Sequence, residues 1–344
     1  MRRIVVAVLA FLVACGGSTT SDVTTPVDAS TATDASTPID AASGNARPLG
    51  SVGSMTEVAC ANVPGNATCK HAVVTCPGIP DLGATLAVLA PAAPTRTIVG
   101  FSGGGGDSFL SSGIQALAME GSFRIVLVKW DSDWEKTPSD GILAGACRPA
   151  TILQAIFDGM HGADRTKAFC ATGHSGGSGQ ISYALAHYGR EEILDYAALS
   201  AGPPFGRIDY GCAPSTYTGP PRNLCPLLPN AVLPLPDKVD GWENTTTCGS
   251  ATASATDLEK WKRDSVVSST ADYDYPKTPV GFFDCTNQPN GTTGGAFFYS
   301  SAVTSEHAVF CFDGGNDGCQ GESLGKGVEK LVSEIVGKCV PRHN

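Results

Sequence analysis

The sequence lacks several features that would place it in common classes of protein. Only 16% of its residues are charged and no long basic stretch occurs, so nucleic acid is not expected as a partner. The apolar run at the N-terminus, residues 4–14, is too short to span a bilayer. No internal repeat is present. No cysteine spacing gives two close pairs with histidines, which argues against a zinc site and predicts no metal.

What the N-terminus does contain is typical of export. Met1-Arg2-Arg3 is a short basic region, and residues 4–14 have the length of a signal peptide's apolar segment. The run ends at Leu12-Val13-Ala14-Cys15-Gly16, which resembles a bacterial lipobox, where cleavage precedes an acylated cysteine. The alternative is an ordinary secretory signal with a chance cysteine. We expect lipidation at Cys15 and anchoring in the bacterial cell envelope, at the outer membrane or the cell surface.

The segment after the signal peptide is predicted to be a tether. Residues 16–46 are mainly Ser, Thr, Asp, Ala, Gly and Pro without an aromatic residue, and such a composition cannot offset the entropy of ordering. We therefore expect a signal peptide at 1–14, a lipidated and disordered linker at 15–48, and one domain at 49–344. The net charge of −10 indicates solubility rather than a particular substrate.

The cysteine content agrees with export. The chain has 13 cysteines, which leaves an even number after lipidation of Cys15, and an even number in an oxidising compartment predicts disulfides. Cys170, in an expected buried strand, is predicted to be a free core thiol. The local candidates for pairing are Cys60 or Cys69 with Cys76, Cys212 with Cys225 or Cys248, and Cys311 with Cys319.

Hydrophobic patterns predict a succession of strands and helices. Strands are expected at residues 72–75, 84–89, 97–101, 124–129, 167–172, 196–200, 280–283 and 296–303, and helices at 108–119, 149–160, 177–188, 257–267 and 324–336. This alternation predicts an α/β fold, with a mostly parallel sheet flanked by helices. Residues 203–278, rich in Pro and Cys, are expected to form a cap-like, disulfide-braced excursion before the last strands.

The pattern Gly-x-Ser-x-Gly occurs twice, around Ser102 and around Ser175. A pattern this short arises by chance, so its context must decide. A nucleophilic serine needs a strand that runs into a tight turn and then a helix. Ser175, in Gly173-His174-Ser175-Gly176-Gly177, lies between such an expected strand and helix.

Ser102 begins a different feature. It is followed by Gly103-Gly104-Gly105-Gly106, a run of unhindered backbone amides that suits the stabilisation of an oxyanion. A phosphate-binding loop would require a following Gly-Lys-Ser/Thr, which is missing; a simple loop is the remaining alternative.

Together, the two glycine-containing runs resemble the oxyanion loop and nucleophile elbow of α/β-hydrolases. A trypsin-like protease shares Gly-x-Ser-Gly-Gly, but that class is all-β. The resemblance implies an α/β-hydrolase fold, ester cleavage through an acyl-serine and no cofactor. It also implies an oxyanion hole formed by the amides of Gly176, Gly103, Gly104 and Gly105.

The resemblance also implies an acid and then a histidine after the serine. His307, expected in a loop between the last strand and the last helix, is the predicted base. Asp284, at the end of the strand at 280–283, is the predicted acid, with Glu306, Asp313 and Asp209 as alternatives.

Residues 130–135 are expected at the rim of the site because they follow a strand. Trp130 and Trp134 would bind substrate there or be buried. Asp131, Asp133 and Glu135 are similar to a calcium loop without its central glycine, and a polar loop is the alternative. The sequence thus predicts a serine carboxylic-ester hydrolase acting on a small-molecule or lipid ester. A non-catalytic surface lipoprotein that uses the fold for binding and a serine peptidase are the alternatives.

Overall fold

The computed structural model describes residues 46–61, 63, 66–111, 113–137, 140–213, 216–217, 224–225, 248, 253–285, 291–312 and 326–344. The chain divides into two units, residues 1–39 and 40–344, and all described residues belong to the second. Cys15, most of the tether, Asp313 and much of the excursion lie outside the described residues. Within the described part, no helix has both the length and the apolar character needed to cross a bilayer.

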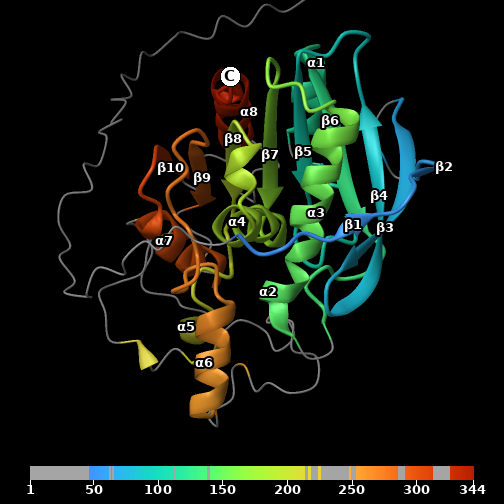
Figure 1. Ribbon diagram of the computed structural model, residues 1–344. Helices are drawn as coiled ribbons and strands as arrows, with labels where there is room; N and C mark the ends of the chain where they lie inside the picture. The colour runs from blue at the N-terminus through green and yellow to red at the C-terminus, as the bar shows by residue number, and fades with distance from the viewer. Residues whose placement is uncertain are drawn as a thin grey trace, which may run out of the picture. The chain divides into compact units, whose positions relative to one another are not determined.

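A mixed β-sheet forms the centre of the domain (Figure 1). Its strands in the described residues are β1 (Ser51–Val52), β2 (Thr56–Val58), β3 (Thr68–Cys76), β4 (Ile79–Leu89), β5 (Arg96–Phe101), β6 (Phe123–Trp130), β7 (Ala168–His174), β8 (Tyr196–Ser200), β9 (Val280–Cys285) and β10 (His307–Phe312). Their order is β1-β3-β4-β6-β5-β7-β8-β9-β10, and β2 pairs with β3. The expected antiparallel entry pair is confirmed as β3 and β4, and all neighbours from β6 to β10 are parallel.

The central strands are apolar along their whole length because helices cover both faces of the sheet. In β8 every residue is buried, and in β7 only His174 is partly exposed. Continuous apolar strands are typical of parallel sheets that are covered on both sides. One face packs against α1 (Ile114–Met119) and α8 (Lys326–Lys338).

The other face packs against α2 (Gly141–Gly145), α3 (Cys147–Ala155) and α4 (Gly176–Tyr188), with α7 (Gly291–Ala302) adding Tyr299 to the same core. α3 continues into one π-helical turn at Ile156–Met160, and a 3-10 turn at Arg190–Glu192 follows α4. α5 (Ile208–Cys212) and α6 (Ala255–Asp264) lie beyond the end of the sheet toward which β7 and β9 point (Figure 1). The mostly parallel, helix-flanked sheet confirms the expected α/β-hydrolase fold.

Five disulfides connect described cysteines, and only part of the predicted pairing is right. The bonds are Cys60–Cys69, Cys76–Cys147, Cys170–Cys339, Cys212–Cys248 and Cys225–Cys311. The alternative Cys212–Cys248 is confirmed. Cys170 is not a free thiol, because the chain after α8 returns to the start of β7 and brings Cys339 to it. Disulfides in this number indicate an oxidising, extracytoplasmic compartment.

Two expected elements near the C-terminus are wrong. Residues 296–303, predicted to be a strand, lie mostly within the helix α7, because a short apolar run such as Ala296-Phe297-Phe298-Tyr299 has no period that separates strand from helix. His307 was expected in a loop after the last strand, but it is the first residue of β10. The helix predicted at 108–119 is also shorter and begins at Ile114, and α5 was not predicted.

Candidate active site

Ser175 occupies the sharp turn between β7 and α4. Its backbone has φ 50° and ψ −113°, a conformation that residues with a Cβ atom rarely adopt and that is found mainly at functional sites. The Ser175 amide donates to the Ser200 carbonyl at 2.8 Å, and the Ser175 carbonyl accepts from the Gly179 amide at 3.1 Å. The turn is therefore fixed by β8 on one side and by the helix on the other.

The glycines of the turn are required by close approaches of the backbone. A Cβ atom on Gly176 would lie 2.1 Å from the Gly104 carbonyl oxygen, and one on Gly177 would lie 2.2 Å from the Phe101 carbonyl oxygen. On Gly173 it would lie 2.4 Å from the Gly177 carbonyl oxygen. No side chain fits at these positions, so the turn packs directly against the chain that follows β5.

That chain is the glycine loop, residues 103–106. It turns back on itself through a hydrogen bond of 3.2 Å from the Gly106 amide to the Gly103 carbonyl, and Gly104 and Gly106 have φ of 58° and 78°. A Cβ atom on Gly103 would lie 3.4 Å from the Ser175 Cβ. Within the described residues, the amides of Gly103, Gly104 and Gly105 donate to no carbonyl. The structure thus brings Gly103 and the contacting pair Gly104 and Gly176 beside Ser175, whereas the nearest neighbour of Gly105 is Asp133.

Ser102, in the second copy of the motif, is engaged elsewhere. Its side chain is buried, and its hydroxyl donates to the Ser108 carbonyl at 2.6 Å. This bond closes the base of the glycine loop. Ser102 therefore fixes the shape of the loop, whereas the half-buried Ser175 remains accessible.

Asp284 lies at the same edge of the sheet as Ser175. His174 pairs with Ser200, and Ser200 pairs with Phe283, so Asp284 and Ser175 each lie one residue beyond the same level. We call this side, where the parallel strands end, the carboxyl edge. Because side chains alternate along a strand, buried Asp284 shares a face with Phe282, whose core cluster includes Ile181 of α4.

His307 is not near these residues. It pairs with Val280 at the start of β9, whereas Asp284 pairs with Cys311. Four residues of strand separate the two levels, which is about 13 Å at 3.3 Å per residue. The exposed His307 ring donates from Nδ1 to the Ser305 carbonyl at 2.9 Å. The structure therefore corrects the prediction: His307 lies at the opposite side, where the parallel strands begin, which we call the amino edge, and it is not brought to Ser175.

The remaining histidines are all described, and four of them contact other groups. These contacts are His71 with Asp131, His161 with Thr97 and Asp164, His187 with Ser265, and His343 with Leu194. The sixth, His174, precedes Ser175, and its Cδ2 lies 3.2 Å from the position of a Cβ on Gly103. His174 is thus packed against the glycine loop, as is expected for a residue inside the turn.

The alternative acids have other partners or lie outside the described residues. Glu306 lies beside His307 at the amino edge and forms an ion pair of 2.8 Å with Lys338. Asp209 of α5 is buried and accepts from the Arg207 Nε at 2.8 Å. Asp313 lies outside the described residues. Asp284 is therefore the described carboxylate at the carboxyl edge that best fits the predicted role.

The last residue of β6 and the segment after it form what we call the tryptophan loop, residues 130–136. Trp130 and Trp134 are fully buried, so they form part of the core rather than a substrate surface. Asp131 contacts His71 at 2.9 Å and Asp133 contacts Lys136 at 2.8 Å. These carboxylates thus have separate partners, and the described residues contain no cluster of three or more potential metal ligands.

Glu135, in the same loop, has an unusual environment that the sequence did not reveal. Its side chain is 6% exposed, and its Oε2 has no hydrogen-bond partner among the described residues. Burial raises the pKa of Glu135 to about 7, and the negative charge of Asp133 adds to the increase. A buried carboxyl group with a raised pKa therefore lies next to Trp134, whose amide donates to the Gly105 carbonyl of the glycine loop.

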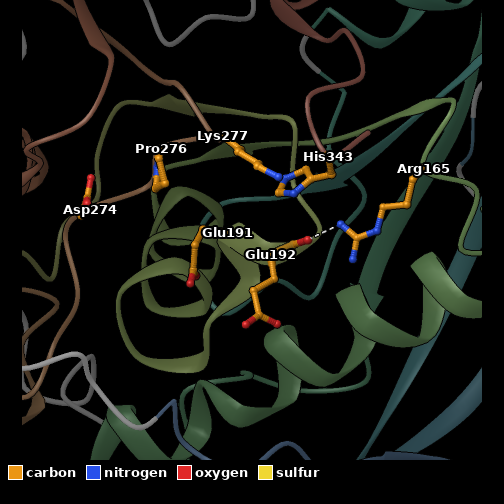
Figure 2. A pocket seen from close by; sticks show the side chains of 7 residues that line it. All are labelled: Arg165, Glu191, Glu192, Asp274, Pro276, Lys277 and His343. Atoms are coloured by element: carbon orange, nitrogen blue, oxygen red, sulfur yellow. Dashed lines mark hydrogen bonds between the residues drawn. The ribbon is translucent and has the colours of Figure 1, made fainter.

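A cavity of about 480 Å³ lies at the opposite edge of the sheet (Figure 2). Its lining residues are Arg165, Glu191, Glu192, Asp274, Pro276, Lys277 and His343. Those from 165 to 277 lie shortly before β7, β8 or β9, which places the cavity at the amino edge. It is therefore separate from Ser175 and the glycine loop.

Comparison with solved structures finds chains of the same general layout. Acetyl xylan esterase 1 from Thermoanaerobacterium sp. JW/SL YS485 is 10% identical with a TM-score of 0.45, over 76% of this chain and 80% of that one. An esterase from Pyrobaculum calidifontis is 12% identical with a TM-score of 0.47, over 78% and 83%. A thermostable carboxylesterase cloned from a metagenomic library is 13% identical with a TM-score of 0.48, over 79% and 90%. No protein-family model and no curated protein matches the sequence.

Proposed function

We propose that this chain is a serine hydrolase that cleaves carboxylic esters through an acyl-Ser175 intermediate. The observation that carries the proposal is the strained conformation of Ser175, with φ 50°, directly beside the glycine loop. Strain at a residue that is not glycine persists only where the surrounding structure enforces it. Here the conformation is maintained by close backbone packing of the turn, which Gly173, Gly176 and Gly177 permit because they have no side chain.

In the proposed reaction, the Ser175 Oγ attacks the carbonyl carbon of the ester and its proton passes to a base. The carbonyl oxygen becomes an oxyanion that accepts from the amide of Gly176 and from the glycine loop. The Gly176 amide is available because the first N–H groups of a helix have no partner within it. The tetrahedral intermediate then expels the alcohol, which takes up the proton, and water hydrolyses the acyl-serine.

We assign the base to Asp284, acting through one water molecule. Two strand spacings separate β7 from β9, which is about 10 Å between their backbones. A serine side chain, an aspartate side chain and one bridging water span such a gap, and a base acting through one water is within the usual limits. His71, His161, His187, His307 and His343 contact other groups. His174 is packed against the glycine loop, so a carboxylate is favoured in this role.

Reaction with a fluorophosphonate probe tests the nucleophile. We expect covalent labelling of the wild-type protein and of S102A, because the Ser102 hydroxyl is bonded to Ser108, and no labelling of S175A. Hydrolysis of p-nitrophenyl esters of increasing acyl length then identifies the substrate class. Labelling that persists in S175A would overturn the proposal.

A second candidate function is ester binding without turnover, and the position of His307 favours it. A protein that retains the turn and the oxyanion loop but lacks a histidine base would hold an ester or become acylated slowly. Stoichiometric labelling at Ser175 without repeated hydrolysis of any ester would support this function. Steady turnover that depends on Ser175 would exclude it.

We further propose that the protein is anchored to the cell envelope through a lipid on Cys15. The disulfides support export, because such bonds persist in oxidising compartments, and the run that ends at Cys15 resembles a lipobox. Metabolic labelling with an alkyne fatty acid should mark the wild type and not C15S. Equal labelling of both would contradict the anchor.

A further inference from the structure

The glycine loop is held in place from the side that faces away from Ser175. The Trp130 amide donates to the Gly106 carbonyl at 2.8 Å, and the Trp134 amide donates to the Gly105 carbonyl at 3.0 Å. Because a peptide group is planar, fixing the Gly105 carbonyl also fixes the Gly106 amide, which donates to the Gly103 carbonyl at 3.2 Å. The Gly103 carbonyl shares its peptide plane with the Gly104 amide, so the direction of that amide is fixed as well. The tryptophan loop therefore determines how the glycine loop faces Ser175.

The tryptophan loop is in turn held by one buried side chain, Arg148 of α3. Its Nη1 donates to the carbonyls of Trp134 and Lys136, at 2.7 and 2.9 Å, and its Nη2 donates to the Pro80 carbonyl at 2.8 Å. Arg148 is 3% exposed. A planar guanidinium can reach three carbonyls at once, which an ammonium on a lysine side chain cannot reproduce.

Glu135 lies between the two carbonyls of the tryptophan loop that Arg148 binds. The charged groups that act on Glu135 are Arg148, Asp133 and Lys136, and Asp81 also acts on Arg148. The Arg148 Nε and the Glu135 Oε2 are both buried without a hydrogen-bond partner among the described residues. Arg148 thus donates its hydrogen bonds to carbonyls of the tryptophan loop and does not form a salt bridge with the neighbouring Glu135 carboxyl group.

We infer that the buried pair Arg148 and Glu135 positions the glycine loop that faces Ser175. Arg148 anchors the tryptophan loop, and a neutral Glu135 allows that loop to stay buried. Loss of the Glu135 proton places a buried negative charge in the core, which favours opening of residues 131–136 and releases the Gly105 carbonyl from the Trp134 amide. The two residues act through the loop and do not touch substrate, and their effect on hydrolysis rests on the function proposed above.

The experiment compares R148K with a matched control, R190K, in the full-length protein. Arg190 is also buried, with 7% exposure, but its Nε donates to the Tyr188 carbonyl at the far end of α4. Amide hydrogen exchange is measured in peptides that cover residues 103–107 and 130–136. We expect exchange to rise at least tenfold in R148K and to remain at the wild-type rate in R190K. Unchanged exchange in R148K, or an equal rise in both variants, would overturn the inference.

The same variants are assayed with a p-nitrophenyl ester. We expect R148K to lower kcat about tenfold with little change in KM, because the loop stabilises the transition state rather than the bound ester. An R148K enzyme that has a loosened loop but the wild-type kcat would overturn the role in the reaction. If the wild type shows no hydrolysis, the proposed function fails, while the exchange data still decide whether the pair positions the loop.

The contribution of Glu135 is tested with E135Q, which keeps the shape and removes the proton equilibrium. We expect exchange in residues 130–136, corrected for intrinsic rates, to rise in the wild type between pH 6 and 8 and to stay constant in E135Q. The ratio of kcat/KM for E135Q to that of the wild type should rise in the same range. Identical pH profiles of exchange in both proteins would remove Glu135 from the inference.

Discussion

His307 and Asp284 lie at opposite edges of the sheet, although β9 and β10 are neighbours. His307 pairs with the first residue of β9, Val280, and Asp284 pairs with Cys311 near the end of β10. In a parallel pair both strands run the same way, so the start of β10 cannot approach the residue that follows the end of β7. Because of this separation, His307 cannot form a catalytic triad with Ser175 and Asp284, and the proposed reaction uses Asp284 as the base instead.

The first prediction follows from that separation. H307A should hydrolyse esters with kcat/KM within about twofold of the wild type, whereas D284N should lose roughly 100-fold or more, the usual contribution of a general base. Steady-state kinetics with one p-nitrophenyl ester measures both. Circular dichroism spectra of D284N serve as the control for folding, since Asp284 is buried. A large loss in H307A with a small one in D284N would contradict the assignment of the base.

The second prediction concerns the contact between the turn and the glycine loop. G176A places a methyl group 2.1 Å from the Gly104 carbonyl oxygen if nothing moves, so the glycine loop must shift away from Ser175. Loss of one oxyanion donor costs about 3 kcal/mol of transition-state stabilisation, so we expect kcat to fall at least 100-fold.

The matched control for this variant is G121A. Gly121 has φ 65° with open space around it, so alanine there brings backbone strain of about 1 kcal/mol without a clash. G121A should therefore lose some stability and retain wild-type kcat. Equal kcat values for G176A and the wild type would show that the contact does not define the oxyanion site.

The third prediction concerns the disulfide between Cys170 and Cys339. It closes a loop with a sequence separation of 169 residues and ties the C-terminus to β7. The C170A/C339A double variant should lose about 2–5 kcal/mol in the free energy of unfolding, because long closed loops restrict the unfolded chain most. C60A/C69A, which opens a loop with a separation of only nine, should lose less. Urea unfolding at pH 7 measures both, and the reverse ranking would refute the argument.

The sequence predicted the parts of the site that depend on local structure. A strand, a glycine-flanked serine and a helix are adjacent in the chain, so Ser175 and its turn could be recognised from residues 168–188, and the glycine run was equally local. The position of His307 could not be predicted from the sequence. It depends on whether residues 296–303 form a strand or a helix, and their apolar run fits both. If residues 296–303 had formed the last strand, His307 would have followed it in a loop. Because they lie mostly in α7, His307 is instead the first residue of β10.

The features that depend on tertiary contacts could not be predicted from the sequence either. The pairing of Cys170 requires the chain after α8 to return to β7, and spacing carries no information about such a return. The burial of Glu135 results from the packing of α2 and α3 around the tryptophan loop. In the sequence, Glu135 is one of three alternating acids that look equally exposed.

The last prediction is the pH dependence of stability that follows from Glu135. Its pKa is about 7 in the folded protein, above the ordinary value of 4.5, so the folded state retains a proton that the unfolded state releases. The resulting stability is fully present below pH 4.5 and is lost as the pH rises to about 7. The shift amounts to about 3 kcal/mol at most.

The measurement is the free energy of unfolding by urea between pH 4.5 and 8, for the wild type and E135Q. The wild type should lose stability relative to E135Q up to pH 7 and show a constant difference above it. The pKa of Glu191 is also raised to about 7 by burial, so E191Q is the matched control, and each substitution should remove its own part of the slope. A difference between wild type and E135Q that is independent of pH would show that Glu135 ionises normally in the folded protein.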